Sequence, residues 1–67
     1  MNWQSVFFSD QLYKAEIVKG VLEENGINAV IVNKKDSAYH LGVSEVHVSA
    51  QHIIRAIKIV DDDINFT

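Results

Sequence analysis

The chain has 67 residues and a mass of 7.6 kDa, which is enough for a single small domain over residues 1–67. Hydrophobic residues make up 48% of the chain and charged residues 22%, a composition typical of a folded rather than a disordered protein. The sequence contains no cysteine, which excludes disulfides, thiolate metal sites and a cysteine nucleophile.

The net charge is −3, and the six lysine and arginine residues are scattered along the chain. We expect no nucleic-acid binding, because phosphate recognition depends on clustered cations. The longest apolar run, residues 29–32, is far shorter than the roughly 20 residues that cross a bilayer. Since the chain also starts without a basic, apolar leader, we expect a cytoplasmic protein that does not enter the membrane.

The first half of the chain predicts a strand followed by a helix. Residues 3–8 are rich in strand formers, and the strand ends at Ser9 and Asp10, either of which can cap a helix. Asn25 and Gly26 are a typical helix end, since glycine readily adopts the left-handed conformation that satisfies the last carbonyls. The helix between these signals is supported by apolar residues at helical spacing, namely Leu12, Ala15, Val18 and Leu22, with Ile17 and Val21 widening the stripe.

The next part of the chain predicts a hairpin. Residues 27–33 form the most apolar strand, and residues 34–42 are a polar connection. Residues 43–48 predict a third strand, because their side chains alternate between two faces. One face of this strand carries Ser44, Val46 and Val48, and the other carries Val43, Glu45 and His47.

A second helix is predicted to follow, with Ser49 as its cap. The helix is expected to fray near Val60, because the carboxylates of Asp61, Asp62 and Asp63 oppose the dipole at its C-terminal end. We expect these three aspartates to be solvated. The predicted apolar stripe consists of Ala50, Ile53, Ala56, Ile57 and Val60, broadened by Ile54 and Ile64.

The element order β-α-β-β-α predicts an α+β fold of the ferredoxin-like type, with two helices on one face of a three-stranded sheet. In this scheme the third strand is central, the second pairs with it as a hairpin, and the first lies parallel on its other side. The first strand then has a free edge, unless a short fourth strand at residues 64–67 or another chain covers it.

Two strands look apolar on both of their faces, which favours a homodimer that buries the second sheet face or the free edge. In the second strand, Val30 and Val32 lie on one face, and Ile27, Ala29 and Ile31 lie on the other. Strict alternation along the first strand places Trp3 and Phe7 on one face and Val6 and Phe8 on the other. The residues assigned to a dimer or edge contact are Phe7, Val30 and Val32.

Residues 15–27 carry a more specific pattern, A-E-x-x-K-x-x-L-E-x-x-G-I. Together with the preceding Ser9-Asp10 and the closing Val46-His47-Val48, it resembles a family of small bacterial domains of unknown function. These are known as prokaryotic signal transducing proteins and are grouped with the nitrogen-regulatory P-II-like proteins. The resemblance covers about residues 6–60. It implies a ferredoxin-like fold and a regulatory or ligand-sensing role, and it brings no catalytic residues. Residues 33–42 form a much shorter connection than a full P-II loop, which does not favour P-II-type nucleotide sensing.

The polar connection is the best candidate for a binding site, because loops on a rigid scaffold commonly carry binding groups. Its side chains could hold a small anionic metabolite or an acidic partner, although a solvated connection whose charges only keep the chain soluble is the simpler interpretation. The candidate residues are Lys34, Lys35, Asp36, Tyr39 and His40.

Nothing in the sequence predicts catalysis, a cofactor or a metal site. The three histidines, at positions 40, 47 and 52, lack the spacing of metal ligands, and no glycine-rich phosphate loop or nucleophile motif is present. We therefore expect a non-enzymatic regulatory or signal-transducing domain that binds a small anionic ligand or a protein partner. The alternative is an interaction module that adds a partner strand to the free sheet edge.

Overall fold

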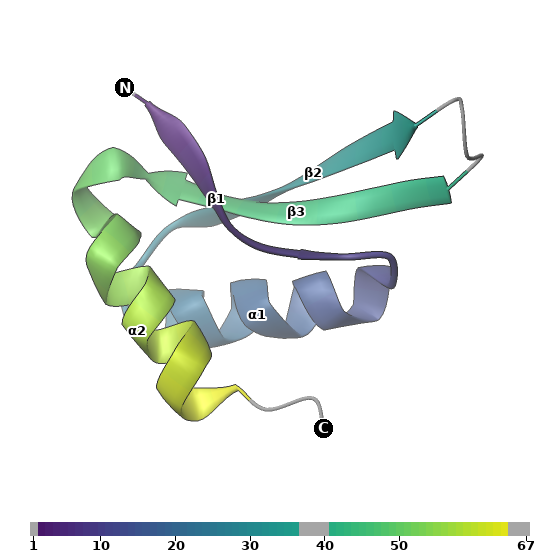
Figure 1. The fold of residues 1–67 in the computed structure, drawn as a ribbon. Coiled ribbons are helices and arrows are strands. Elements are labelled where there is room, and N and C mark those ends of the chain that lie inside the picture. The colour runs from purple at the N-terminus through teal and green to yellow at the C-terminus, as the bar shows by residue number, and fades with distance from the viewer. Residues whose placement is uncertain (1, 37–40, 65–67) are drawn as a thin grey trace.

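The computed structural model describes residues 2–36 and 41–64, and at residues 35, 36 and 41 it describes the backbone alone. The elements follow the predicted β-α-β-β-α order, and the α+β architecture is consistent with a ferredoxin-like fold (Figure 1). Their bounds are β1 (Trp3–Ser9), α1 (Leu12–Glu24), β2 (Ala29–Asp36), β3 (Leu41–Ser49), the short 3-10 turn η1 (Ala50–His52) and α2 (Ile53–Asp63).

The three strands form one sheet in the order β1-β3-β2, so that β3 is central as predicted. Both of its neighbours pair with it in antiparallel fashion, and the expected parallel placement of β1 beside β3 is wrong. The crossover through α1 brings the chain back in its original direction, which makes β1 and β2 run the same way. The hairpin then reverses β3, and β3 inserts between them antiparallel to both. Both helices lie on one side of this sheet (Figure 1).

The hairpin strands are longer than predicted, because the pairing continues into the polar connection. Lys34, Lys35 and Asp36 pair with Val43, Gly42 and Leu41, which leaves residues 37–40 outside the described part of the chain. At the other end, β2 begins at Ala29, two residues later than expected.

The core lies between the sheet and the two helices. The predicted alternation over residues 43–48 is confirmed, since Ser44, Val46 and Val48 are buried and Val43, Glu45 and His47 are only partly so. The helix α1 buries Ala15, Val18 and Leu22 of its predicted apolar stripe, and Val21 packs against the core, while Leu12 and Ile17 are exposed. The complete set of buried apolar side chains is Ala15, Val18, Leu22, Ile27, Ala29, Val46, Val48, Ala56 and Ile59.

The ends of α1 differ in how well they were predicted. The N-cap is Gln11, and neither Ser9 nor Asp10 takes that position; the Ser9 hydroxyl instead accepts a bond from the Gln11 amide at 3.0 Å. The C-terminal end is as predicted. Gly26 has φ +79°, a conformation that disfavours residues with a Cβ, and its N–H donates to the Glu23 carbonyl at 3.0 Å.

The apolar stripe predicted for α2 is only partly correct. Ile59, which was not included, is buried with Ala56, while the predicted Ile54 is 86% exposed and Ile57 is half exposed. The predicted Ile53, Val60 and Ile64 do pack against the core, so the stripe was placed too far toward Ile54 and too far from Ile59.

The two ends of α2 also depart from the prediction. Ser49 caps η1 rather than the α-helix, and its side chain makes no capping bond. The helix does not fray near Val60 but continues to Asp63, although the three aspartates are exposed as expected. Ile64 is extended, and the rest of the proposed fourth strand, residues 65–67, lies outside the described residues.

A β-bulge at Val6 changes which way the β1 side chains face. Ser5 pairs with His47 and Phe7 pairs with the adjacent Val46, so Val6 is an extra residue without a partner on β3. As a result Phe7 and Val6 both pack against the core, and the predicted strict alternation is wrong. The Ser5 hydroxyl donates across the bulge to the Phe7 carbonyl at 3.2 Å.

Candidate functional site

The side of the sheet away from the helices has no cover in the described part of the chain. Residues paired directly across antiparallel strands point to the same face, so the register identifies the side chains on this side. We call this surface the open sheet face. Its members are Trp3, Ser5 and Phe8 of β1, Val30, Val32 and Lys34 of β2, and Val43, Glu45 and His47 of β3.

The rim of the open sheet face is apolar. Phe8 is 72% exposed, and Trp3 and Val30 are also among the exposed large hydrophobic residues. Phe8 and Val32 flank Glu45 from the two outer strands, and Val30 lies beside His47. Aromatic residues gathered on one uncovered surface are characteristic of protein-binding surfaces.

The centre of the open sheet face is polar. The Nε2–H of His47 donates to Glu45 Oε1 at 2.8 Å, and the Lys34 ammonium lies 3.4 Å from the same oxygen. The side chains of His47 and Glu45 are only 16% and 19% exposed, whereas that of Lys34 is mostly exposed. We refer to these three residues as the Lys34–Glu45–His47 cluster.

The backbone explains why this cluster forms. Glu45 and His47 are two residues apart on β3, so their side chains emerge on the same face. Lys34 pairs with Val43, which places it diagonally across from Glu45, within reach of a long side chain. The hydrogen bond from His47, and to a lesser degree the Lys34 ammonium, holds the pKa of Glu45 below its ordinary 4.5, although burial acts in the opposite direction.

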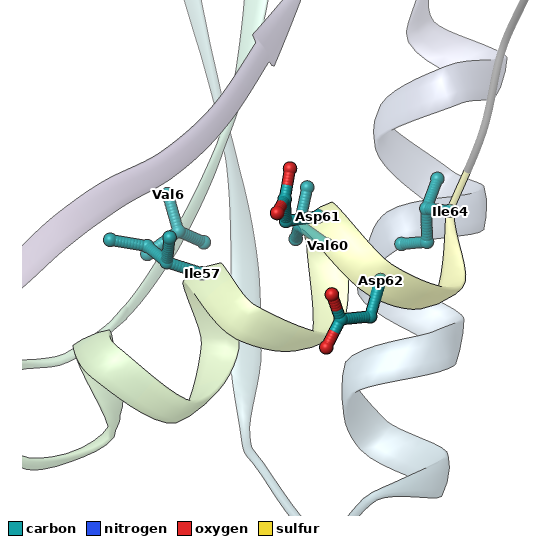
Figure 2. A pocket seen from close by; sticks show the side chains of 6 residues that line it. All are labelled: Val6, Ile57, Val60, Asp61, Asp62 and Ile64. Atoms are coloured by element: carbon teal, nitrogen blue, oxygen red, sulfur yellow. The ribbon is translucent and has the colours of Figure 1, made fainter.

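A groove lies on the helix side of the sheet, between the edge strand β1 and α2. Its volume is about 520 Å³. Figure 2 shows Val6 and Ile57 together at one end, Ile64 at the other and two aspartates between them. We call it the α2–β1 groove; its lining residues are Val6, Ile57, Val60, Asp61, Asp62 and Ile64.

The residues predicted as a ligand site are not brought together as one cationic site. Lys34 is in β2, and its ammonium lies close to Glu45. Lys35 and Asp36 extend the same strand, and Tyr39 and His40 lie outside the described residues. A hollow of about 410 Å³ lies near this end of the sheet. Among its described lining residues, Lys34 carries a positive charge and Asp10 a negative charge, so these residues give the hollow no net positive charge.

The predicted dimer residues divide between the two faces. Val30 and Val32 belong to the open sheet face as expected. Phe7 lies on the edge strand, but its side chain packs against the core, and the aromatic residue presented on the open face is its neighbour Phe8.

The sequence analysis did not identify the Lys34–Glu45–His47 cluster. The spacing Glu45-x-His47 on a strand was a usable signal, because it places a carboxylate and an imidazole on one face. The partnership with Lys34 required the hairpin register, and the α2–β1 groove required the packing of two elements distant in the sequence.

The described residues offer neither a metal-binding cluster nor a membrane-spanning helix. Residues 2–36 and 41–64 contain no group of three or more histidine, aspartate or glutamate side chains that could hold a metal ion. Within the same ranges, neither helix is both long and apolar enough to cross a membrane.

Comparison with known proteins gives one match. No curated protein and no solved structure matches the chain. The model of one protein family does, and it aligns with residues 3–63, from the first residue of β1 to the last residue of α2. The description of this family is "Putative prokaryotic signal transducing protein". The match spans nearly the whole chain and all of its strands and helices, and the chain therefore belongs to this family.

Proposed function

We propose that the chain is a non-enzymatic, cytoplasmic signal-transducing domain that acts through protein–protein contact at the open sheet face. A second copy of the chain is its first partner. The observation that carries this proposal is the composition of that face, where exposed Phe8, Trp3 and Val30 surround a polar cluster. Binding surfaces commonly combine aromatic side chains with a few oriented polar groups.

A homodimer is supported by the size of the chain and by the charges on the face. A domain of this length buries a smaller fraction of its surface than a larger domain does, and it gains from the additional burial that a partner provides. In a two-fold symmetric contact the same patch faces itself. Lys34 and Glu45 have opposite charges, so a two-fold axis allows each to meet the other across the interface.

A small anionic ligand is the less favoured occupant. Of the residues predicted to bind a ligand, Lys34 is the one whose side chain the structure describes. Its ammonium lies 3.4 Å from a carboxylate oxygen of Glu45. An anion would have to compete with Glu45 for that lysine.

The oligomeric state of the protein tests the proposal. Sedimentation across a wide range of concentration is expected to give a species of twice the 7.6 kDa chain mass. The Phe8→Ser variant should dimerise about tenfold more weakly or worse, because a buried aromatic anchor contributes more than about 1.4 kcal/mol. The matched control is Ile54→Ser, which removes an even more exposed apolar side chain from α2.

Exchanging the charges of Lys34 and Glu45 tests the same interface more specifically. The Lys34→Glu and Glu45→Lys variants each place charges of one sign at both positions, so each alone should be monomeric. When they are mixed, opposite signs face each other and a mixed dimer should form. A monomer at every concentration, or equal weakening by Ile54→Ser and Phe8→Ser, would contradict the proposed interface.

A further inference from the structure

The α2–β1 groove has the dimensions and the lining of a site for part of another polypeptide. Its volume of about 520 Å³ is within the usual range of binding pockets. Four aliphatic residues supply apolar lining, and one of them is the bulged Val6 of the edge strand. The groove is on the helix side of the molecule, so it does not overlap the open sheet face.

The charges in the groove define the chemistry of an occupant. Asp61 and Asp62 both contribute to the lining (Figure 2). They occupy the last turn of α2, where the negative end of the helix dipole disfavours carboxylates. Among the described residues, no cation forms an ion pair with either of them. A cationic group placed between them would relieve both the mutual repulsion and the unfavourable interaction with the dipole.

The neighbouring strand restricts the length of the occupant. The sheet order leaves the outer edge of β1 without a partner strand among the described residues, so backbone groups there are available for pairing. The bulge at Val6 interrupts this edge, and bulges oppose continuous strand addition. The groove therefore suits a short segment held mainly by its side chains rather than a full additional strand.

From these observations we propose that the α2–β1 groove binds a short extended segment of another protein in which an apolar residue is flanked by lysine or arginine. The apolar side chain packs on Val6 and Ile57 at one end of the groove, and the cation lies beside Asp61 and Asp62. This site is independent of the proposed dimer, because the two surfaces share no residue.

A short capped peptide of alternating leucine and lysine is a suitable probe, and the same peptide with glutamate in place of lysine is its counterpart. The titration uses ¹⁵N-labelled full-length chain carrying Phe8→Ser, so that dimerisation at the open sheet face does not contribute. We expect the lysine peptide to shift the amide signals of Val6, Ile57 and Ile64. The glutamate peptide should leave them unchanged.

Matched variants separate a specific site from general attraction to an acidic protein. The Asp61→Asn/Asp62→Asn double variant should bind the lysine peptide about fivefold more weakly, as expected for two partly exposed charge pairs. The Asp63→Asn/Glu24→Gln variant removes the same charge outside the groove lining and should change the affinity less than about twofold. For the apolar part, Ile57→Ala should weaken binding while Ile54→Ala, one turn away on α2, should not.

Five results would overturn the proposal, four of them seen with peptide present. These are the absence of any shift with the lysine peptide, equal binding of the glutamate peptide, equal effects of the two double variants, and shifts confined to the open sheet face. Concentration-dependent shifts of the groove signals without peptide would overturn it as well, since they would assign the groove to a second copy. None of these results bears on the dimer at the open sheet face, which has its own variants.

Discussion

The two faces of the sheet are built from alternate residues of the same strands but have different compositions. On the face covered by the helices, Val46 and Val48 of β3 are fully buried. On the open face, the intervening Glu45 and His47 join Lys34 in a charged cluster with an apolar rim. The covered face resembles a minimal core, whereas the open face resembles a binding surface. The pleat of the strand thus separates the buried core from the proposed binding surface, although both are built from the same segments of the chain.

The largest effect is expected from a core substitution on the covered side. Leu22→Ala removes a fully buried side chain and should lower the free energy of unfolding by about 2–5 kcal/mol. Val30→Ala on the open face should cost less than about 1 kcal/mol. Urea denaturation measures both, in the Phe8→Ser background so that only the monomer contributes. If the two substitutions cost the same, the proposed division between the faces is wrong.

A smaller loss of stability is expected when a polar group is removed from the covered face. The buried Ser44 hydroxyl donates to Asn33 Oδ1 at 2.8 Å, and Ser44→Ala should cost about 1 kcal/mol. The exposed Ser5 hydroxyl also makes a hydrogen bond, but Ser5→Ala should cost less than about 0.5 kcal/mol, because water replaces an exposed partner. A larger loss for Ser5→Ala would mean that the bulge matters more to stability than the buried hydroxyl does.

The smallest effect is expected on the open face, and it depends on pH. The folded-state pKa of Glu45 lies below its ordinary 4.5, so its contribution to stability is complete above pH 4.5. This contribution is lost as the pH falls through the folded-state pKa. Glu45→Gln should therefore reduce the stability difference between neutral and strongly acidic pH. Unfolding curves over this range test the prediction, with the exposed Glu16→Gln of α1 as the control, and identical slopes for Glu45→Gln and the native chain would contradict it.

Local signals were sufficient for much of the fold. The helix end at Gly26 is encoded by one residue type, and the alternation of β3 by hydrophobicity at every second position. The face of α2 was predicted only in part, because hydrophobicity alone does not distinguish the exposed Ile54 from the buried Ile59. The direction of β1 relative to β3 was also missed, although the topology implies it once the hairpin is placed between the first two strands.

The candidate sites were less predictable than the fold, for a physical reason. The polar connection was chosen because its residues are adjacent in the sequence, but a binding surface depends on adjacency in space. Lys34 meets Glu45 only through the hairpin register, and Val6 meets Ile57 only through the packing of α2 on β1. Pairing and packing of this kind are properties of the assembled sheet.

The bulge in β1 means that the pairing with β3 does not need every residue of the strand. Ser5 and Phe7 already pair with consecutive residues of β3, so deleting Val6 would leave every other side chain of β1 on its present face. Val6 is therefore surplus to the pairing. With it, two successive residues, Val6 and Phe7, pack against the core, and Val6 also lines the groove, while Phe8 remains on the open face. A strand of strict alternation would place Val6 and Phe7 on opposite faces, and the one unpaired residue lets this edge serve the core and the groove together.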